Sequence, residues 1–207
     1  KEWKWFVYEK LFDIKKGKRL TQADMIEGQI RYIGAIDSNN GLSAYIGNDT
    51  QLHNGNTITV SYNGSIGYAF YQDEKFWATD DVNVLYPKYS LNRYIAIFLC
   101  TIIQQEQYRF CYGRKWDLEM MKKSRMKLPA IRNEKGEYEP DWQFMEDYIK
   151  SLPYSKNIEP SDPNEIVDEL MEVKKEMIKL RHQLQAHNPQ ELQIVGGNVT
   201  INDYSTT

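Results

Sequence analysis

The feature that most constrains the fold is a heptad repeat in residues 162–188. Apolar residues recur there at spacings of 4, 3, 4, 3 and 4, which is typical of a coiled-coil helix. Asp162 and Pro163 predict a helix start and Pro189 a stop, and at 1.5 Å per residue the seam from Ile166 to Leu184 is roughly 27 Å long. It predicts a helical partner, most simply a second copy, although a single helix folded back on its own domain has the same pattern. The seam residues are Ile166, Leu170, Val173, Met177, Leu180 and Leu184.

This helix divides the chain. With 207 residues, the chain has room for one medium-sized domain and an appendage. We predict a domain over residues 1–152, a linker over 153–161, the coiled-coil helix, and a tail over 189–207. The tail has two short apolar runs around a Gly-Gly pair, which indicates a β-hairpin.

The first 90 residues have the pattern of strands. Residues 57–61 alternate in polarity and residues 66–71 return after Asn63-Gly64, a pair typical of a two-residue hairpin turn. A further strand is expected over residues 81–86.

The pattern then becomes helical. Residues 94–103 define one apolar face, with Asn92 as the cap, and Asp141 caps a second short helix that ends at Leu152. Residues 133–140 are interpreted as a polar loop. These patterns predict an α+β fold, a β-rich domain with packed helices followed by a long coiled-coil helix.

Charge is unevenly distributed. Residues 1–127 contain 18 Lys and Arg against 14 Asp and Glu, whereas residues 128–207 contain 8 against 15, within a net charge of -3. The excess of basic residues in 1–127 favours phosphate binding, and the excess of acidic residues in 128–207 favours protein partners. Ordinary solvated surface charge has the same pattern.

The chain shows no membrane span and no signal-peptide core, so we expect a cytoplasmic protein without membrane partners. Cys100 and Cys111 match no zinc spacing and are expected to be reduced.

The sequence contains no recognisable catalytic motif. The sequence has no glycine-rich nucleotide loop and no Asn/Asp-Pro-Pro-aromatic run that would hold a base for methylation. Asp141 and Glu172 match a metal-dependent nuclease pattern weakly, but Glu172 falls beside the heptad seam. His53, His182 and His187 are not spaced as ligands of one metal ion. We therefore predict no catalytic residue, no metal site and no cofactor.

The sequence contains an ordered set of short phrases. They are FDIKKGKRLT (12–21), IRYIGA (30–35), NNG (39–41), GSIG (64–67), ATDDV (78–82), YGRKW (112–116), KLP (127–129) and DWQFME (141–146). In this order, the phrases resemble the target-recognition domain of type I restriction-modification specificity subunits and of related type IIB-like enzymes. The likeness covers residues 3–152, and the helix extends it.

The resemblance implies a non-catalytic module that recognises a DNA sequence for other subunits. Its expected partners are double-stranded DNA, a DNA methyltransferase subunit and a restriction (nuclease) subunit. A full specificity subunit of this family has two recognition domains, so this chain resembles half a subunit that dimerises through its helix, or a fragment. Residues from 190 onward match nothing in the family.

Three segments are expected to contact DNA. A flexible, lysine-rich loop suits phosphates, loop tips with amides suit base edges, and a third segment combines forked cations with aromatic rings. For each residue, a turn or an ordinary surface cation is the alternative. The residues expected to contact DNA are, segment by segment, Lys15, Lys16, Lys18 and Arg19; Ser38, Asn39, Asn40, Tyr62 and Asn63; and Tyr112, Arg114, Lys115 and Trp116.

The sequence is also compatible with two other functions. The chain could be the recognition portion of a fused methyltransferase-nuclease, which an upstream catalytic domain would identify. It could also be a coiled-coil adaptor whose β-rich domain binds protein, which salt-sensitive DNA affinity would exclude.

Overall fold

The computed structural model describes residues 1–111, 113–155, 175 and 177–179. The chain divides into two compact units, Lys1–Ile158 and Glu159–Thr207. In the second unit the four described residues are helical, and among them Met177 is 66% exposed. The rest of the predicted heptad seam and the predicted tail hairpin lie outside the described residues.

The central sheet of the first unit has four antiparallel strands in the order β2-β8-β5-β6. They are β2 (Phe12–Lys16), β8 (Val82–Pro87), β5 (Thr57–Ser61) and β6 (Ala69–Gln72). Every residue of β5 is buried, because this inner strand has a neighbour on each side and is covered on its faces. The sheet is therefore the scaffold on which the surface loops are mounted.

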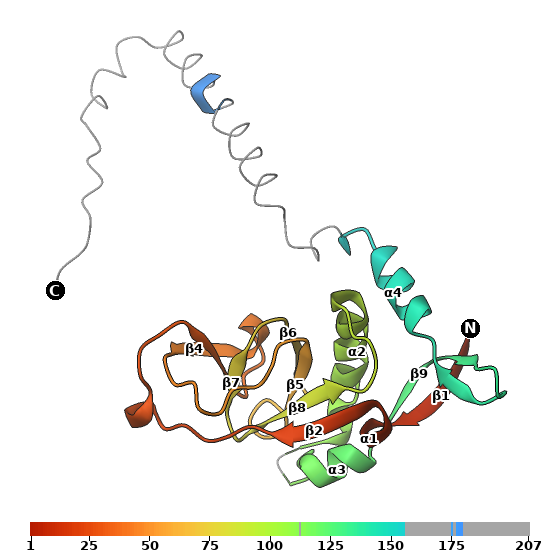
Figure 1. Ribbon diagram of the computed structural model, residues 1–207, viewed down its shortest axis with the longest axis horizontal. Helices are drawn as coiled ribbons and strands as arrows, with labels where there is room; N and C mark the ends of the chain where they lie inside the picture. The colour runs from red at the N-terminus through yellow and green to blue at the C-terminus, as the bar shows by residue number, and fades with distance from the viewer. Residues whose placement is uncertain (112, 156–174, 176, 180–207) are drawn as a thin grey trace. The chain divides into compact units, whose positions relative to one another are not determined.

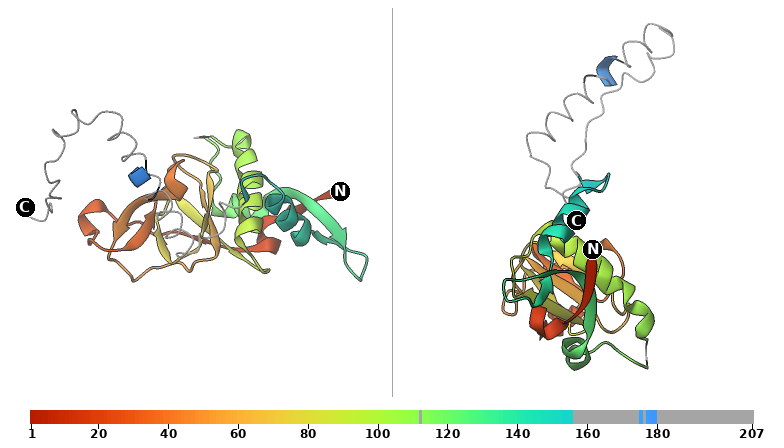
Figure 2. Two further views of the ribbon diagram at one scale, coloured as in Figure 1. Left: turned by 90° about the horizontal axis from the view of Figure 1, so that it is seen from above. Right: turned by 90° about the vertical axis from the view of Figure 1, so that its right-hand side faces the viewer.

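Two three-stranded sheets extend this scaffold. One has the order β4-β3-β7, in which β3 pairs antiparallel with β4 and parallel with β7. The other has the order β1-β9-β10 and is antiparallel. They lie toward opposite ends of the unit, with α2 between them (Figures 1 and 2). Their strands are β3 (Ile30–Ile33), β4 (Leu42–Ile46), β7 (Phe76–Ala78), β1 (Glu2–Val7), β9 (Arg125–Arg132) and β10 (Tyr138–Pro140).

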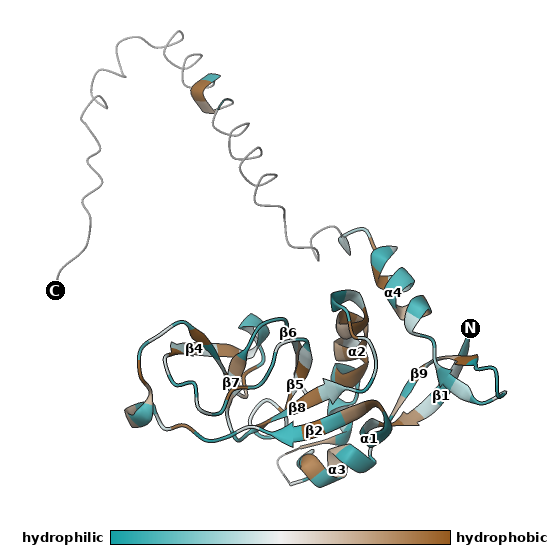
Figure 3. Ribbon diagram, viewed as in Figure 1, coloured by the Kyte–Doolittle hydropathy of each residue, from teal (hydrophilic) through white to brown (hydrophobic). Residues whose placement is uncertain are grey.

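Helix α2 (Arg93–Gln105) organises the core. Its apolar residues (Figure 3) pack against β6 and α4, and Ile95, Leu99 and Ile103 are almost completely buried. The other helices are α1 (Tyr8–Leu11), α3 (Leu118–Lys123) and α4 (Trp142–Lys150), with 3-10 turns η1 (Gln22–Asp24), η2 (Asn39–Gly41) and η3 (Gln107–Arg109).

Two predicted helix caps are confirmed, whereas the predicted start at Asp162 lies outside the described residues. The Asn92 Oδ1 atom accepts a hydrogen bond from the Ile95 amide at 2.9 Å, and the Asp141 Oδ1 atom accepts one from the Phe144 amide at 2.9 Å. Each satisfies a backbone donor that the first helical turn leaves free. Within the described residues, no helix combines the length and the apolar character that crossing a membrane requires.

Two local predictions were wrong. β5 and β6 form the expected hairpin, but residues 62–68 connect them, so Asn63-Gly64 is not a two-residue turn. Gly64 and Gly67 have positive φ angles of 68° and 79°, whereas Asn63 does not. Residues 138–140, expected in a loop, form strand β10 on the edge of β9. The mixed, β-rich architecture with few helices is confirmed.

Candidate nucleic-acid interface

The first cationic segment is more ordered than a flexible loop. Lys15 and Lys16 are the last residues of β2 and pair with Val84 and Asn83 of β8, so the prediction of a flexible loop is wrong for these two lysines. Their side chains are exposed, as are those of Lys18 and Arg19 just beyond the strand. The four cations therefore lie at the end of one edge strand of the central sheet, where Lys15 and Lys16, as successive strand residues, point to opposite faces.

Close backbone packing at Gly17 and hydrogen bonds at Lys18 fix the residues that follow β2. A Cβ atom on Gly17 would lie 2.2 Å from the Thr79 carbonyl oxygen, so only glycine fits there. The Lys18 amide donates to the Ala78 carbonyl at 2.8 Å, and the Lys18 carbonyl accepts from the Trp77 indole at 2.7 Å. These bonds hold the cations in place at a lower entropy cost than a free loop would incur on binding.

Tyr62 and Asn63 lie beside this edge. The Lys16 Nζ atom is 5.3 Å from the centre of the Tyr62 ring, and a hydrogen bond with Tyr62 raises the pKa of Lys16. The Tyr62 hydroxyl donates to the Asp80 carbonyl at 2.6 Å, and the Asn63 amide donates to the Asp81 carboxylate at 3.0 Å. The structure therefore brings these two residues together with Lys16, but their donors already have partners within the protein.

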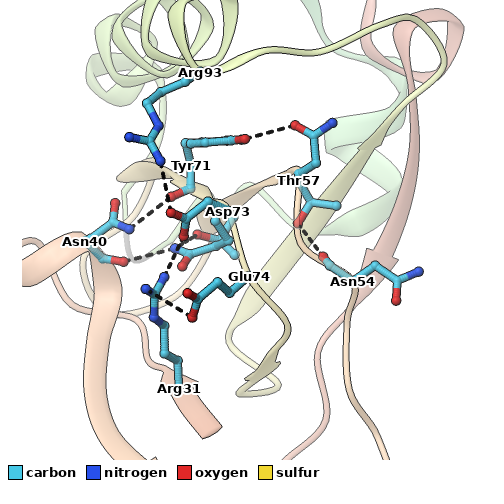
Figure 4. Close-up of polar contacts among 11 residues, drawn as sticks. Arg31, Asn40, Asn54, Thr57, Tyr71, Asp73, Glu74 and Arg93 are labelled. Atoms are coloured by element: carbon cyan, nitrogen blue, oxygen red, sulfur yellow. Dashed lines mark hydrogen bonds and ion pairs between the residues drawn. The ribbon is translucent and has the colours of Figure 1, made fainter. Parts of the chain in front are cut away.

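Ser38, Asn39 and Asn40 lie in an exposed tip at η2. Asn39 and Asn40 have positive φ angles of 49° and 52°, a conformation that asparagine tolerates better than most residues. Their amides also hold the turn, since Asn39 donates to the Leu42 carbonyl at 3.1 Å and Asn40 to the Tyr71 carbonyl at 2.9 Å (Figure 4). The tip is preorganised.

Sequence reasoning missed an ion-pair network beside this tip. Asp73 accepts from Arg31 at 2.7 Å and from Arg93 at 3.2 Å, and Arg31 also lies 3.3 Å from Glu74 (Figure 4). Arg31 and Asp73 are 42 positions apart, so no local motif could reveal the pair. The one available signal was the presence of Arg31 in the phrase at residues 30–35.

Residues 112–116, the third segment expected to contact DNA, contribute both to the core and to the surface. Trp116 is completely buried, donates to the Ser124 hydroxyl at 2.9 Å and stacks on Phe110 with ring centroids 4.5 Å apart. Its predicted role at the DNA surface is therefore corrected to a role in the core, because no part of the ring is accessible. Tyr112 lies outside the described residues.

Arg114 does lie on the surface. Its amide and carbonyl pair with those of Cys111 at 2.9 and 3.2 Å, which closes a tight turn. The Arg114 side chain is exposed and Lys115 is half-buried. Among the predicted DNA-binding residues of this segment that the structure describes, Arg114 and Lys115 have accessible side chains.

His53 is the histidine within the described residues. Its Nδ1 atom lies 2.8 Å from the Tyr86 hydroxyl and its ring stacks on Phe76, and burial lowers its pKa. Among the described residues no group of three or more His, Cys, Asp or Glu side chains is arranged to hold a metal ion. His182, His187 and Glu172 lie outside the described residues.

Three solved structures share this fold. An S subunit of a type I restriction-modification system from M. genitalium matches with a TM-score of 0.52 and 17% identity, over 86% of this chain and 42% of that one. The HsdS subunit from Thermoanaerobacter tengcongensis matches with a TM-score of 0.51 and 13% identity, over 75% and 37%. A chain from a type I restriction-modification assembly matches with a TM-score of 0.52 and 10% identity, over 89% and 43%.

Sequence comparison gives a closer relationship. The type II restriction enzyme specificity subunit S.BcgI from Heyndrickxia coagulans is 37% identical over 151 residues, which is 72% of this chain and 43% of that subunit. The match thus spans less than half the length of that relative. The family model described as type I restriction modification DNA specificity domain matches residues 1–159. The chain belongs to the family of type I restriction-modification DNA specificity domains.

Proposed function

We propose that this chain recognises a sequence in duplex DNA for a restriction-modification system and catalyses no reaction itself. The observation that carries the proposal is the match of residues 1–159 to a DNA specificity domain. A separate DNA methyltransferase subunit and a restriction (nuclease) subunit would carry out the chemistry.

The cationic edge supports DNA binding physically. Lys15, Lys16, Lys18 and Arg19 are exposed on a backbone that hydrogen bonds fix. Cations that neutralise phosphates release counterions, so their contribution to binding falls as salt rises. Such contacts position a protein on DNA but do not read its sequence. We therefore assign these four residues to the phosphates, and assign the tip at Ser38, Asn39 and Asn40 and the cations Arg114 and Lys115 to the grooves.

A salt titration tests this assignment. The affinity of the chain for random duplex DNA is measured by fluorescence anisotropy at several salt concentrations, for wild type and for Lys15→Ala, Lys18→Ala and Arg19→Ala combined. Each lost phosphate contact should weaken binding and lower the salt slope by about one unit. Lys135→Ala, in the exposed loop between β9 and β10, is the matched control. An unchanged slope in the triple variant would contradict the assignment, and a wild-type chain without DNA affinity would contradict the function.

We also propose that two chains assemble through residues 162–188. The heptad spacing and the exposed, helical Met177 support a helical partner, and a match that covers 43% of S.BcgI suits one half of a two-domain subunit. Light scattering should give a dimer for wild type and a monomer for Leu170→Glu with Leu180→Glu. A wild-type monomer at micromolar concentration would refute dimerisation.

A further inference from the structure

A groove of about 720 Å³ lies between α2 and α4, beside β1. These elements lie toward one end of the unit (Figures 1 and 2). The residues that line its walls recur every three or four positions, so each wall is one face of a helix. A groove between two helix faces has the shape that a third helix fills. The wall residues include Phe98, Ile102 and Gln105 of α2, and Phe144, Tyr148 and Leu152 of α4 and the turn after it.

The groove exposes large apolar side chains to solvent. Tyr148 is 49% exposed, Leu152 39% and Trp3 38%. The Trp3 ring stacks on Phe98 with the ring centroids 6.2 Å apart, which joins β1 to the α2 wall. Trp5, two residues along the same face of β1, is 53% exposed. A continuous exposed apolar surface with Trp and Tyr side chains is typical of a protein interface, and a partner can reach these side chains without rearrangement of the domain.

The uncompensated charge beside this surface is positive. Lys127 of β9 lines the groove and lies opposite Trp5 in the strand register, and the Arg125 guanidinium lies 5.8 Å from the centre of the Trp5 ring. Within the described residues neither cation forms an ion pair. Glu106, which also lines the groove, is already paired with Arg109. A partner with carboxylates would therefore complement the two cations.

Duplex DNA suits this surface poorly. It would supply phosphates for the two cations, but its backbone and groove edges offer few apolar groups to cover Trp, Tyr and Leu side chains. An amphipathic helix with acidic residues satisfies both features, because it buries an apolar stripe and keeps its charges at the edge of that stripe.

We infer that this groove docks an acidic amphipathic helix of the DNA methyltransferase subunit, an identification of the partner that rests on the proposed function. The apolar stripe of the helix lies against Trp3, Tyr148 and Leu152, and its carboxylates lie beside Lys127 and Arg125. The groove belongs to the end of the unit that holds the β1-β9-β10 sheet, whereas β2 runs away from that end toward its cationic residues (Figure 1). The chain can therefore hold DNA and the methyltransferase at the same time.

Calorimetric titration of the full chain with the methyltransferase subunit tests the inference. Tyr148→Ala combined with Leu152→Ala removes two exposed side chains from the groove, so binding should weaken about tenfold or more. Ile26→Ala combined with Tyr45→Ala is the matched control, because these side chains are also exposed but lie in or before the β4-β3-β7 sheet. The control should bind like wild type.

Lys127→Glu is the second variant, since it changes the charge and leaves the exposed aromatic surface in place. It should weaken binding most strongly at low salt, where charges are least screened. Lys135→Glu, in the exposed loop between β9 and β10, should have no such effect. Weaker binding by both groove variants, with the melting temperature, DNA affinity and mass in light scattering unchanged, supports the inference.

Wild-type affinity of the Tyr148 and Leu152 double variant would overturn the inference. Loss of dimer mass or of DNA affinity in that variant would also overturn it, because the occupant would then be a second copy of the chain or DNA. An unaffected Lys127→Glu variant would overturn the acidic character of the helix. A wild-type chain that does not bind the methyltransferase subunit would refute the inference together with that partner in the proposed function, whereas normal binding by both groove variants refutes the inference alone.

Discussion

Trp116 separates a structural role from a DNA-binding role most sharply. Its ring is completely buried, stacks on Phe110 at 4.5 Å, meets the edge of Tyr8 at 5.4 Å and donates to the Ser124 hydroxyl. Trp116→Ala removes all of these contacts and leaves a cavity, which should cost about 3–5 kcal/mol of unfolding free energy. The domain would then be close to its stability limit.

Trp116→Phe is therefore the more informative change. Phenylalanine keeps a ring for the Phe110 stack, but it loses the indole donor and part of the packed volume. A net hydrogen bond contributes about 1 kcal/mol and the reduced aromatic contact about 0.5–1 kcal/mol. The expected loss is about 1–2 kcal/mol, or about 2–8 °C in melting temperature.

The assay combines urea unfolding, followed by far-ultraviolet circular dichroism, with DNA binding by fluorescence anisotropy below the unfolding transition. Trp116→Phe should lower the unfolding free energy and leave the DNA affinity unchanged. Arg114→Ala is the comparison, because its exposed side chain should affect DNA binding with little effect on stability. The reasoning is refuted if Trp116→Phe weakens DNA binding tenfold while the protein stays as stable as wild type.

Three further outcomes are expected. Burial raises the pKa of Cys100 to about 12, whereas Cys111 is exposed, so Ellman's reagent at pH 8 should label one thiol in the native chain and two after denaturation; two native thiols would contradict the packing. Burial lowers the pKa of His53, so the unfolded chain binds a proton that the native chain does not, and stability falls as pH drops below about 6.5. The unfolding free energy of His53→Gln should therefore decrease less between pH 7.5 and 5.5, and equal decreases would disprove the effect. Asn92→Ala removes the cap on the Ile95 amide and the donor to the Glu146 carboxylate and should cost about 1 kcal/mol or more in urea unfolding, whereas Glu146→Gln leaves the cap in place and should cost less; equal stability of Asn92→Ala and wild type would contradict the cap.

Sequence patterns correctly predicted the elements whose formation depends on residues close together in the chain. The caps at Asn92 and Asp141 are correct because a side-chain oxygen three residues before a free amide needs no distant partner. The apolar face of α2 is correct because a helical repeat places its members on one side regardless of what covers them. The β5–β6 hairpin is correct because its strands are neighbours in the sequence, although the loop between them is longer than predicted.

Sequence reasoning failed where the answer depended on contacts between distant residues. The phrase YGRKW suggested an exposed aromatic and cationic surface, but Trp116 packs against Phe110 and Tyr8 in the core. An amphipathic tryptophan has the same local pattern whether its ring is buried or exposed. Lys15 and Lys16 were expected in a flexible loop, and pairing with β8, about 70 residues later in the chain, places them in a strand.

The sequence by itself determined the β-rich first domain, the position of α2 and its cap, and the family, because these depend on local periodicity and on an ordered series of short phrases. Tertiary structure decided which polar residues meet. The ion pairs of Asp73 with Arg31 and Arg93 have no sequence motif, since they join residues 42 and 20 positions apart. Strand pairing brings these side chains together, and the pairing cannot be inferred from the spacing of the residues along the chain.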